Sequence, residues 1–507
     1  MTTSPSRSPR ASSTRASKRY CGGVHRRSFL SDLGMGVTGM VLGAMLHRDG
    51  IAKPKTDEEV WTPPDGRPHF APKAKSVIWL FMQGGASHIE TFDPKPALNK
   101  YGGMTIGETP YAHVLNSKYN NNTVLFTGKD RGLFTKLLPV QVDFRKRGQS
   151  GIEVTDWWPH VGECIDDISV IRSMWTTDNN HAAQTQFHTG RHIFQGIFPS
   201  IGSWIHYGLG SLNDNLPQFV VMGGTFGDNE GGPAGYSADY LGPQHNGIII
   251  DVDPANPLPL SFPVDGVYKE EQQAEFQLLR RFNELEAVQY PGDPAMMARI
   301  KSYELAFRMQ TSVPDLFKFS EEGSNTERLY GLDNKVTRPF GQICLTARRL
   351  VERGVRFVQV IHGYSTDTLG WDAHFDLKKL HGRTCSEVDK PIGGLLKDLK
   401  QRGLLDETLV VWGTEFGRTP GVQGKTEGRD HHPSAFSCWM AGGGIKGGVI
   451  HGATDELGYH AVENRHYVTD LHATVLHQLG LDPRRLDVPG QKRIEIDYGQ
   501  RIDEIIA

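Results

Sequence analysis

Four short segments of the 507-residue chain are dense in carboxylate and imidazole side chains, the groups that bind metal ions and move protons. They cover residues 83–96, 178–192, 370–376 and 413–433. Carboxylate oxygens together with imidazole nitrogens suit zinc, manganese or iron better than calcium, which prefers oxygen ligands. The four segments therefore predict a site for a divalent metal ion.

The third and fourth segments offer ligands at short spacing. Asp372 and His374 are two residues apart, so in an extended segment they point to the same side and can reach one ion. Glu415 follows an apolar run directly, and His431 and His432 come shortly after it. We therefore predict that these five residues are metal ligands.

The first two segments each have a simpler alternative interpretation. The first carries His88, Glu90 and Asp93 beside glycines that allow close approach of the backbone, but it is also compatible with a tight turn that has a polar rim. The second begins with Asp178 and two asparagines. We predict a helix N-terminus there, where backbone N–H groups favour an anion, and mere capping of that helix is the alternative.

The elements that must position these segments are visible as apolar and amphipathic patterns. Apolar runs typical of buried strands occur at residues 76–82, 168–172, 219–222, 355–361, 408–412 and 436–440. Helical patterns occur at residues 270–309 (with a break at Pro291), 339–354, 385–403 and 468–479. Strands alternating with helices predict an α/β fold with a doubly wound, mostly parallel sheet and helices on both faces. In such sheets functional groups gather at the carboxyl ends of the strands.

The N-terminal 50 residues have the pattern of an export signal. Arg26 and Arg27, followed by Ser-Phe-Leu, resemble a twin-arginine signal. The apolar run at residues 35–46 is too short to span a bilayer, which needs ~20 residues. We expect export to the periplasm or beyond and no stable transmembrane span. An amphipathic surface arm is the alternative.

The remainder of the chain divides into a linker and one large domain. Residues 51–75 are rich in Pro, Lys and Asp and predict a linker. Residues 76–507 are expected to form a single α/β domain with loop insertions near 101–150 and 223–265, which are rich in Gly, Asn and Pro.

Charge and cysteine content exclude two classes of protein. The first 50 residues hold eight Lys and Arg against two Asp and Glu, so the remainder holds 47 against 56 and is mildly acidic. That balance argues against general nucleic-acid binding. None of the five cysteines forms a C-x-x-C pair, which argues against a thiolate zinc site or a thioredoxin-like centre. Whether the four cysteines of the body pair or stay reduced is open.

Five motifs of the chain resemble motifs of the DUF1501 family, which is often labelled sulfatase-like, and they occur in the right order. They are Gly-Gly-Ala-Ser-His-Ile-Glu-Thr-Phe-Asp-Pro-Lys-Pro at 84–96, His-Thr-Gly-Arg at 188–191, Trp-Asp-Ala-His at 371–374, Gly-Thr-Glu-Phe-Gly-Arg-Thr-Pro at 413–420 and Gly-Arg-Asp-His-His-Pro at 428–433. The resemblance covers roughly residues 76–480. That family is similar to the alkaline phosphatase and sulfatase superfamily, which implies one or two divalent metals at the carboxyl edge of the sheet and hydrolysis of phosphate or sulfate esters.

The resemblance also implies roles for single residues. Asp372 and His374 fall where the superfamily has an Asp and a His for one metal. Glu415 stands in the place of the Asp of an Asp-His pair, and His431 or His432 supplies the late histidine. The first strand lacks the superfamily's immediate Asp.

The resemblance places Asn180 at the position of the superfamily's nucleophile. The motif at 188–191, which ends in Arg191, is similar to the end of the helix that carries this nucleophile. An amide cannot attack phosphorus or sulfur as a hydroxyl or thiolate does. We therefore expect catalysis through a metal-activated water, with Asn180, His181 and Arg191 as catalytic residues and His181 as general acid or base. Without the superfamily's Asp, the segment after the first strand offers His88, Glu90 or Asp93 as a metal ligand.

Three functions remain open at this point. The preferred one is an exported metallohydrolase that acts on a sulfated or phosphorylated small molecule or polysaccharide. The second is a metal-bearing protein of the same fold that binds a sugar or sulfated polymer without turnover, as the missing nucleophile suggests. The third is a purely structural exported protein. The oligomeric state is open.

Overall fold

The computed structural model describes residues 64–121, 134–227, 231–252, 312–365 and 368–507, with scattered positions between 271 and 309. The chain divides into two compact units, Met1–Thr62 and Pro63–Ala507, and the described residues belong to the second. The predicted export signal, the first half of the predicted linker and most of the helical pattern at 270–309 lie outside the described residues.

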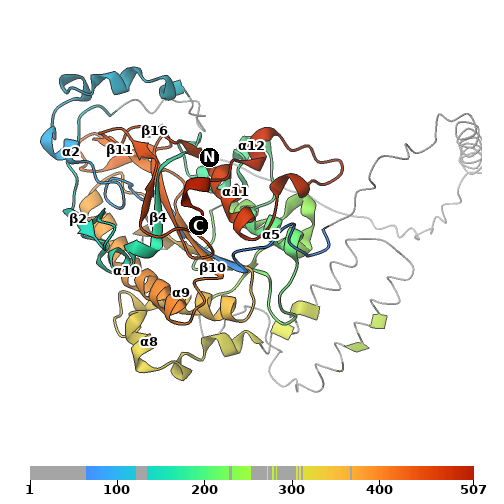
Figure 1. Ribbon diagram of the computed structural model, residues 1–507. Coiled ribbons are helices and arrows are strands. Elements are labelled where there is room, and N and C mark those ends of the chain that lie inside the picture. Colours follow the sequence, from blue (N-terminus) through green and yellow to red (C-terminus); the bar gives the residue numbers. More distant parts are fainter. Residues whose placement is uncertain are drawn as a thin grey trace, which may run out of the picture. The chain divides into compact units, whose positions relative to one another are not determined.

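One mixed, mostly parallel sheet of nine strands forms the centre of this unit (Figure 1). In spatial order the strands are β14 (Val449–His451), β4 (Ile168–Trp175), β13 (Phe436–Ala441), β10 (Thr408–Gly413), β1 (Ser76–Met82), β7 (Phe357–His362), β5 (Phe219–Met222) and β6 (Ile248–Ile249), and β17 (His466–Tyr467) also pairs with β4. All neighbouring pairs are parallel except the two made by β13, which is antiparallel to β10 and β4. The six predicted strands all form, within three residues of their expected bounds.

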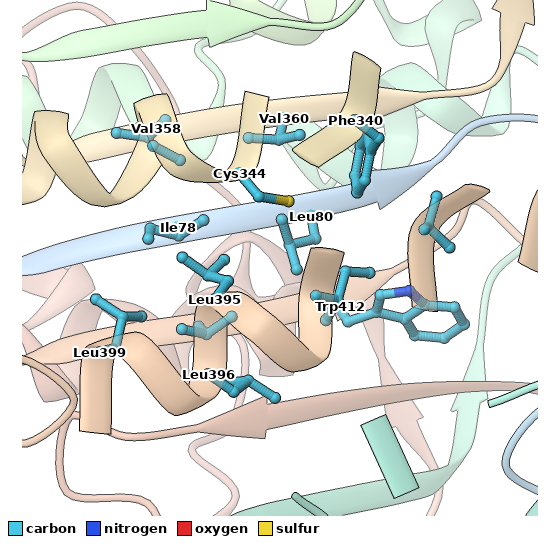
Figure 2. Close-up of a cluster of buried hydrophobic side chains, with 14 of the residues drawn as sticks. Ile78, Leu80, Phe340, Cys344, Val358, Val360, Leu395, Leu396, Leu399 and Trp412 are labelled. Atoms are coloured by element: carbon cyan, nitrogen blue, oxygen red, sulfur yellow. The ribbon is translucent and has the colours of Figure 1, made fainter. Parts of the chain in front are cut away.

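The continuous apolar run of β1 is explained by burial on both faces of the sheet. Ile78 and Leu80 point to one face, where they share a core cluster with two long helices, α9 (Arg338–Glu352) and α10 (Leu377–Gln401). Figure 2 shows these side chains meeting Cys344 of α9 and the leucines of α10.

The alternate residues of β1 face the other side of the sheet. Val77 and Trp79 belong to a second core cluster, to which α5 (Ile201–Leu209) and α11 (Val468–Gln478) contribute. Helices therefore cover both faces, and the predicted doubly wound α/β architecture is confirmed.

Smaller elements surround the sheet. The short helices are α2 (Pro96–Lys100), α3 (Pro159–Gly162), α4 (Ala183–Thr189), α8 (Ser324–Leu329) and α12 (Glu495–Tyr498). The strand pairs are β2 (Phe144–Arg147) with β3 (Ile152–Thr155), β8 (Tyr364–Ser365) with β9 (Thr368–Leu369), β11 (Gly417–Val422) with β12 (Arg429–His432), and β15 (Ala453–Thr454) with β16 (Ala461–Glu463). Within the described parts of residues 101–150 and 223–265, short 3-10 helices also occur. No helix of the described residues is long and apolar enough to cross a membrane.

The antiparallel strand β13 decides which segments meet at the carboxyl edge of the sheet. The parallel strands β1 and β10 end there, at Met82 and Gly413. Because β13 runs the opposite way, the residues that precede it, including β12, lie at that same edge. Segments that follow β1 and β10 are thereby brought close to segments that precede β13.

Two predicted helix starts are wrong. The segment at Asp178 is a turn, and α4 begins only at Ala183, with no side chain capping it, because the Asp178 carboxylate accepts from the Asn180 N–H and pairs with His192. The long helix α10 begins at Leu377 rather than at residue 385, because its first turns are largely polar and carry little apolar periodicity.

Candidate metal centre

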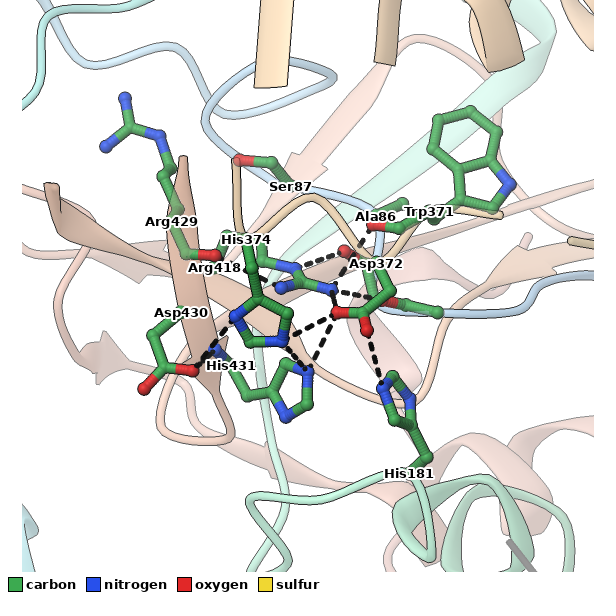
Figure 3. Close-up of polar contacts among 12 residues, drawn as sticks. Ala86, Ser87, His181, Trp371, Asp372, His374, Arg418, Arg429, Asp430 and His431 are labelled. Carbon is green, nitrogen blue, oxygen red and sulfur yellow. Dashed lines mark hydrogen bonds and ion pairs between the residues drawn. The ribbon is translucent and has the colours of Figure 1, made fainter. Parts of the chain in front are cut away.

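Three ligand atoms converge at the carboxyl edge of the sheet (Figure 3). Nε2 of His374 lies 2.9 Å and Nε2 of His431 3.0 Å from Oδ1 of Asp372, and the two nitrogens are 2.9 Å apart. Ligands of a tetrahedral ion with metal–nitrogen bonds of ~2.0–2.1 Å lie ~3.3 Å apart, so small side-chain rotations would make room for an ion.

The other ring nitrogens of the two histidines are held by oxygen acceptors. Nδ1 of His431 donates to the backbone carbonyl of Asn179 at 2.9 Å, and Nδ1 of His374 donates to the side-chain oxygen of Gln423. In the neutral imidazoles the protons are thus at Nδ1, and each Nε2 presents a lone pair. Two lone pairs and a carboxylate oxygen then face one another, an arrangement that a cation or an added proton must neutralise.

A buried arginine supports the central carboxylate from behind. Nη2 of Arg418 donates to Oδ1 of Asp372 at 2.7 Å, and the guanidinium also donates to the backbone carbonyls of Gly84, Gly85, Trp371 and Arg429. The β11–β12 pairing puts Arg418 directly opposite His431. The guanidinium is fully buried, so its role is to hold Asp372 and the surrounding loops rather than to contact a ligand in solution.

His181 lies between two carboxylates. Its Nε2 is 3.2 Å from Oδ2 of Asp372, and its Nδ1 is 3.1 Å from Oε1 of Glu415. Burial lowers the pKa of His181, but the hydrogen bonds and charges of Asp372 and Glu415 outweigh it and raise the pKa to about 9. At neutral pH a protonated imidazole, paired with two carboxylates, therefore lies beside the three converging atoms.

Glu415 is fully buried and makes several hydrogen bonds within the protein. Its Oε1 accepts from the Gly84 N–H at 2.8 Å and from the side-chain amide of Gln184 at 3.4 Å, and its Oε2 accepts from the Thr414 hydroxyl at 3.0 Å. These contacts join the loop after β1, the helix α4 and the loop after β10.

Opposite electrostatic effects act on Asp372 and His431. Burial acts to raise the pKa of Asp372, but the charge of the Arg418 guanidinium, together with the adjacent histidines, holds that pKa far below its usual range. Burial, reinforced by the charge of His181, holds the pKa of His431 well below its ordinary value. The carboxylate is thus ionised and the imidazole neutral at pH 7, which are the states that bind metal ions.

Around His431, two further combinations of three side chains have ligand atoms that all lie within 4.8 Å of one another. One consists of His181, Asp372 and His431, and the other of His374, Asp430 and His431. Because His431 belongs to both, the geometry suits one ion or two adjacent ions that share this ligand.

Three of the predicted ligands lie elsewhere. His88 donates from Nε2 to the Gly458 carbonyl at 2.9 Å, and burial lowers its pKa to about 3. His432 bonds to the Tyr459 carbonyl. The Asp93 carboxylate pairs with Lys95 at 2.9 Å and is 3.5 Å from Arg172.

The predicted catalytic residues are only partly brought together. His181 lies in the cluster, and the neighbouring Asn180 accepts from the His181 N–H through its side-chain oxygen. Arg191 instead pairs with Asp497 of α12, to which its Nη2 donates at 2.7 Å. Glu90, which follows the first strand, forms a fully buried ion pair with Arg429 at 2.8 Å.

The parts of the site that support the candidate ligands were not predicted from the sequence. Arg418, Gln423 and Asp430 stand inside or beside the quoted motifs, but nothing in their residue types marks them as partners of Asp372 and His374. The carbonyl of Asn179 carries no sequence signal at all. The sequence indicated only that Asp372 and His374, two residues apart, and the later His431 could be metal ligands.

The fold and the cluster define a class of protein: a mostly parallel α/β domain with a candidate metal centre at the carboxyl edge of its sheet. The chain belongs to the DUF1501 family, described as a protein family of unknown function, whose model matches residues 74–506. The family predicted from the motifs is thus confirmed. No curated protein matches the chain.

Solved structures give low-scoring matches. A sulfatase from Pseudoalteromonas sp. is 13% identical, with 87% of this chain and 72% of that chain covered and a TM-score of 0.36. A phosphonate monoester hydrolase from Silicibacter pomeroyi is 14% identical, with 66% and 73% covered and a TM-score of 0.33. A protein of the alkaline phosphatase superfamily from Vibrio parahaemolyticus is 10% identical, with 88% and 72% covered and a TM-score of 0.35.

Proposed function

We propose that this protein is an exported, metal-dependent hydrolase of sulfate or phosphate esters. The observation that carries the proposal is the convergence of Asp372, His374 and His431 on one point, with both Nδ1 atoms already donating elsewhere. The Nε2 lone pairs of His374 and His431, together with the Asp372 carboxylate, make a site that favours a cation.

The residues present fit a divalent metal of the zinc, manganese or iron type. Two imidazole nitrogens and one carboxylate oxygen form a ligand set with room for further ligands, as in catalytic rather than closed structural sites. A bound ion of this kind supplies Lewis-acid activation of a water molecule and of the ester. Arg418 keeps Asp372 ionised and oriented for this task.

His181 is the proposed general acid or base. Its two ring nitrogens face Asp372 and Glu415, so it can pass a proton without leaving its place. Glu415 orients the ring from a buried position, anchored by the Gly84 N–H. Asn180 carries no nucleophilic oxygen or sulfur, which favours attack by water over a covalent intermediate.

A cavity beside the cluster supports access for a substrate. It has a volume of about 370 Å³ and is lined by Phe134, His374, Gln423 and Asp430. His374 is therefore shared by the cavity and the cluster.

The metal part of the proposal is tested by His374→Gln. The side chain of His374 is a quarter exposed, so the variant should fold while losing one ligand. We expect metal content, measured by elemental analysis after equilibration with zinc or manganese, to fall well below that of the wild type. Asp406→Asn, an exposed aspartate outside the cluster, is the control. Equal metal content in His374→Gln and the wild type would remove the metal from the proposal.

The catalytic part is tested with a panel of chromogenic sulfate, phosphate and phosphonate esters, run with zinc, manganese and iron(II). We expect metal-dependent turnover of at least one ester class that is lost in His181→Gln. A second function, binding of a sugar or sulfated polymer without turnover, is favoured by the asparagine at position 180. Metal binding with no turnover of any ester would favour that second function.

A further inference from the structure

Two histidines at the β4 edge of the sheet form a pair that the proposed hydrolase site does not use. His451 is the last residue of β14, and His466 is the first of β17; both strands are parallel neighbours of β4. Their Nε2 atoms are 2.8 Å apart, and their ring centroids are 5.0 Å apart. Strand pairing with β4 fixes both backbones, so the two nitrogens are held toward the same point.

A carboxylate orients one of the two rings. Nδ1 of His466 donates to Oδ2 of Asp470 at 2.9 Å, while Oδ1 of Asp470 accepts from the Gln500 N–H at 2.8 Å. The proton of neutral His466 is thus at Nδ1, and its Nε2 presents a lone pair. A carboxylate bonded to the far nitrogen of a histidine is the usual second-shell partner of a metal ligand.

Further carboxylates lie near the pair, in which His451 is buried and His466 is partly exposed. Oε2 of Glu504 is 4.0 Å from Nε2 of His451, and the Glu504 side chain is 64% exposed, so it is free to rotate toward an ion. Glu463 also acts electrostatically on His451. With Asp470 on the other ring, three carboxylates face two imidazoles, a charge balance that favours a cation.

The pair repeats the arrangement of the cluster around Asp372. There, too, two Nε2 atoms lie 2.9 Å apart; both Nδ1 atoms of that cluster donate to oxygens, as Nδ1 of His466 does here. We propose that His451, His466 and Glu504 form a second divalent-metal site, for zinc or a similar borderline ion, with water completing the coordination.

An ion at this site would join three segments that are separate in the sequence. It would tie β14 and β17 to the C-terminal 3-10 helix Asp503–Ile505, which otherwise contacts this edge through main-chain bonds such as Lys446 N–H to the Ile505 carbonyl. The site is therefore structural, and it fastens the C-terminus to the edge of the sheet.

The experiment titrates zinc into the full-length, EDTA-treated protein and follows it by calorimetry and elemental analysis. The variants are His451→Gln, His466→Gln, Glu504→Gln and Asp470→Asn. We expect each histidine variant to bind one zinc equivalent fewer than the wild type, and Asp470→Asn to weaken that zinc ~10–100-fold. Glu504→Gln changes only an exposed side chain, so its weakened binding tests the site without risk to folding.

Controls separate this site from the cluster around Asp372. His113→Gln, an exposed histidine elsewhere, should leave zinc binding unchanged. His374→Gln should remove a different zinc equivalent from the one that His451→Gln and His466→Gln remove. If zinc is lost only in His374→Gln, the second site has failed; if it is lost only in the other two variants, the metal part of the proposed function has failed. In the wild type, zinc should also protect His466 from diethyl pyrocarbonate, read by peptide mass spectrometry. Unchanged stoichiometry and affinity in both histidine variants, or unchanged labelling of His466, would overturn the proposal.

Discussion

Asp372 contacts four basic side chains of the candidate metal centre. Its two oxygens contact Arg418 and three histidines. The same carboxylate is therefore a candidate metal ligand, and it also neutralises a guanidinium that is wholly buried. A substitution at this position changes stability as well as metal affinity.

Asp372→Asn should lower the stability of the metal-free protein strongly. Removing one partner of a buried ion pair leaves the other charge uncompensated, at a typical cost of ~3–5 kcal/mol. His374→Gln leaves the Arg418–Asp372 pair in place and should cost far less. Urea denaturation of the two EDTA-treated variants measures the difference, and equal midpoints would contradict the role assigned to Arg418.

No covalent intermediate should form at the turn that carries Asn180. The residues from Asp178 to Ala182 offer amide, carboxylate and imidazole groups, and none is a sulfatase-type nucleophile or a precursor of formylglycine. Peptide mass spectrometry of the protein, with and without a slow ester substrate, should show unmodified side chains from Asp178 to Thr185. An aldehyde or a trapped phosphoryl group there would contradict attack by water.

At the scale of elements, the loop after β1 is fitted closely to the loop that carries Asp372. Gly84 has φ +116°, and a Cβ atom there would lie 2.7 Å from the backbone nitrogen of Asp372 and 2.8 Å from that of Trp371. The Gly84 N–H also anchors Glu415. Only glycine allows this approach, because any side chain would push the two loops apart.

Gly84→Ala should therefore weaken metal binding although it alters no ligand. The matched control is Gly103→Ala, which has a similarly positive φ of +85° but open space around the new Cβ atom. Both variants carry backbone strain of ~1–3 kcal/mol. Because the strain is common to both, a lower zinc affinity in Gly84→Ala than in Gly103→Ala measures the effect of displacing the loop that carries Asp372. Equal zinc affinities in the two variants would show that the loop contact is unimportant.

The elements themselves were largely predictable from the sequence. Strands buried on both faces, such as β1 and β10, appear as unbroken apolar runs, and α9 and α11 show clear apolar periodicity. The first turns of α10 do not, because they are largely polar. The start of α4 was predicted too early because the Asp178 carboxylate does not cap the helix. It accepts from the Asn180 N–H and pairs with His192 instead.

The site was predictable only at the level of residue types. Asp372, His374 and His431 were predicted as ligands from their residue types and spacing. His88, which donates to a backbone carbonyl instead, cannot be distinguished from a metal ligand by its sequence context. Arg418 reaches Asp372 through the register of β11 and β12, and a register that a β-bulge shifts is not visible in the residues.

At the scale of the whole molecule, export is the prediction that the described residues do not address. Arg26 and Arg27 belong to the part of the chain that resembles a twin-arginine signal. Replacing both with Lys keeps the charge but removes the planar guanidinium groups that a receptor can distinguish. We expect the double variant to stay in the cytoplasm on cell fractionation. Its normal arrival in the envelope would show that the signal is of another kind.

The position of β1 in the sheet has a consequence for biosynthesis. This strand is made first among the strands of the sheet, yet Ser76 pairs with Thr408 and Val77 with Phe357, so both neighbours are made long after it. A growing chain therefore carries an apolar strand with two unpaired edges until most of the protein has been translated. Long-range pairing of this kind folds slowly and exposes apolar surface, so we expect aggregation of the nascent chain to be the main risk until β10 emerges.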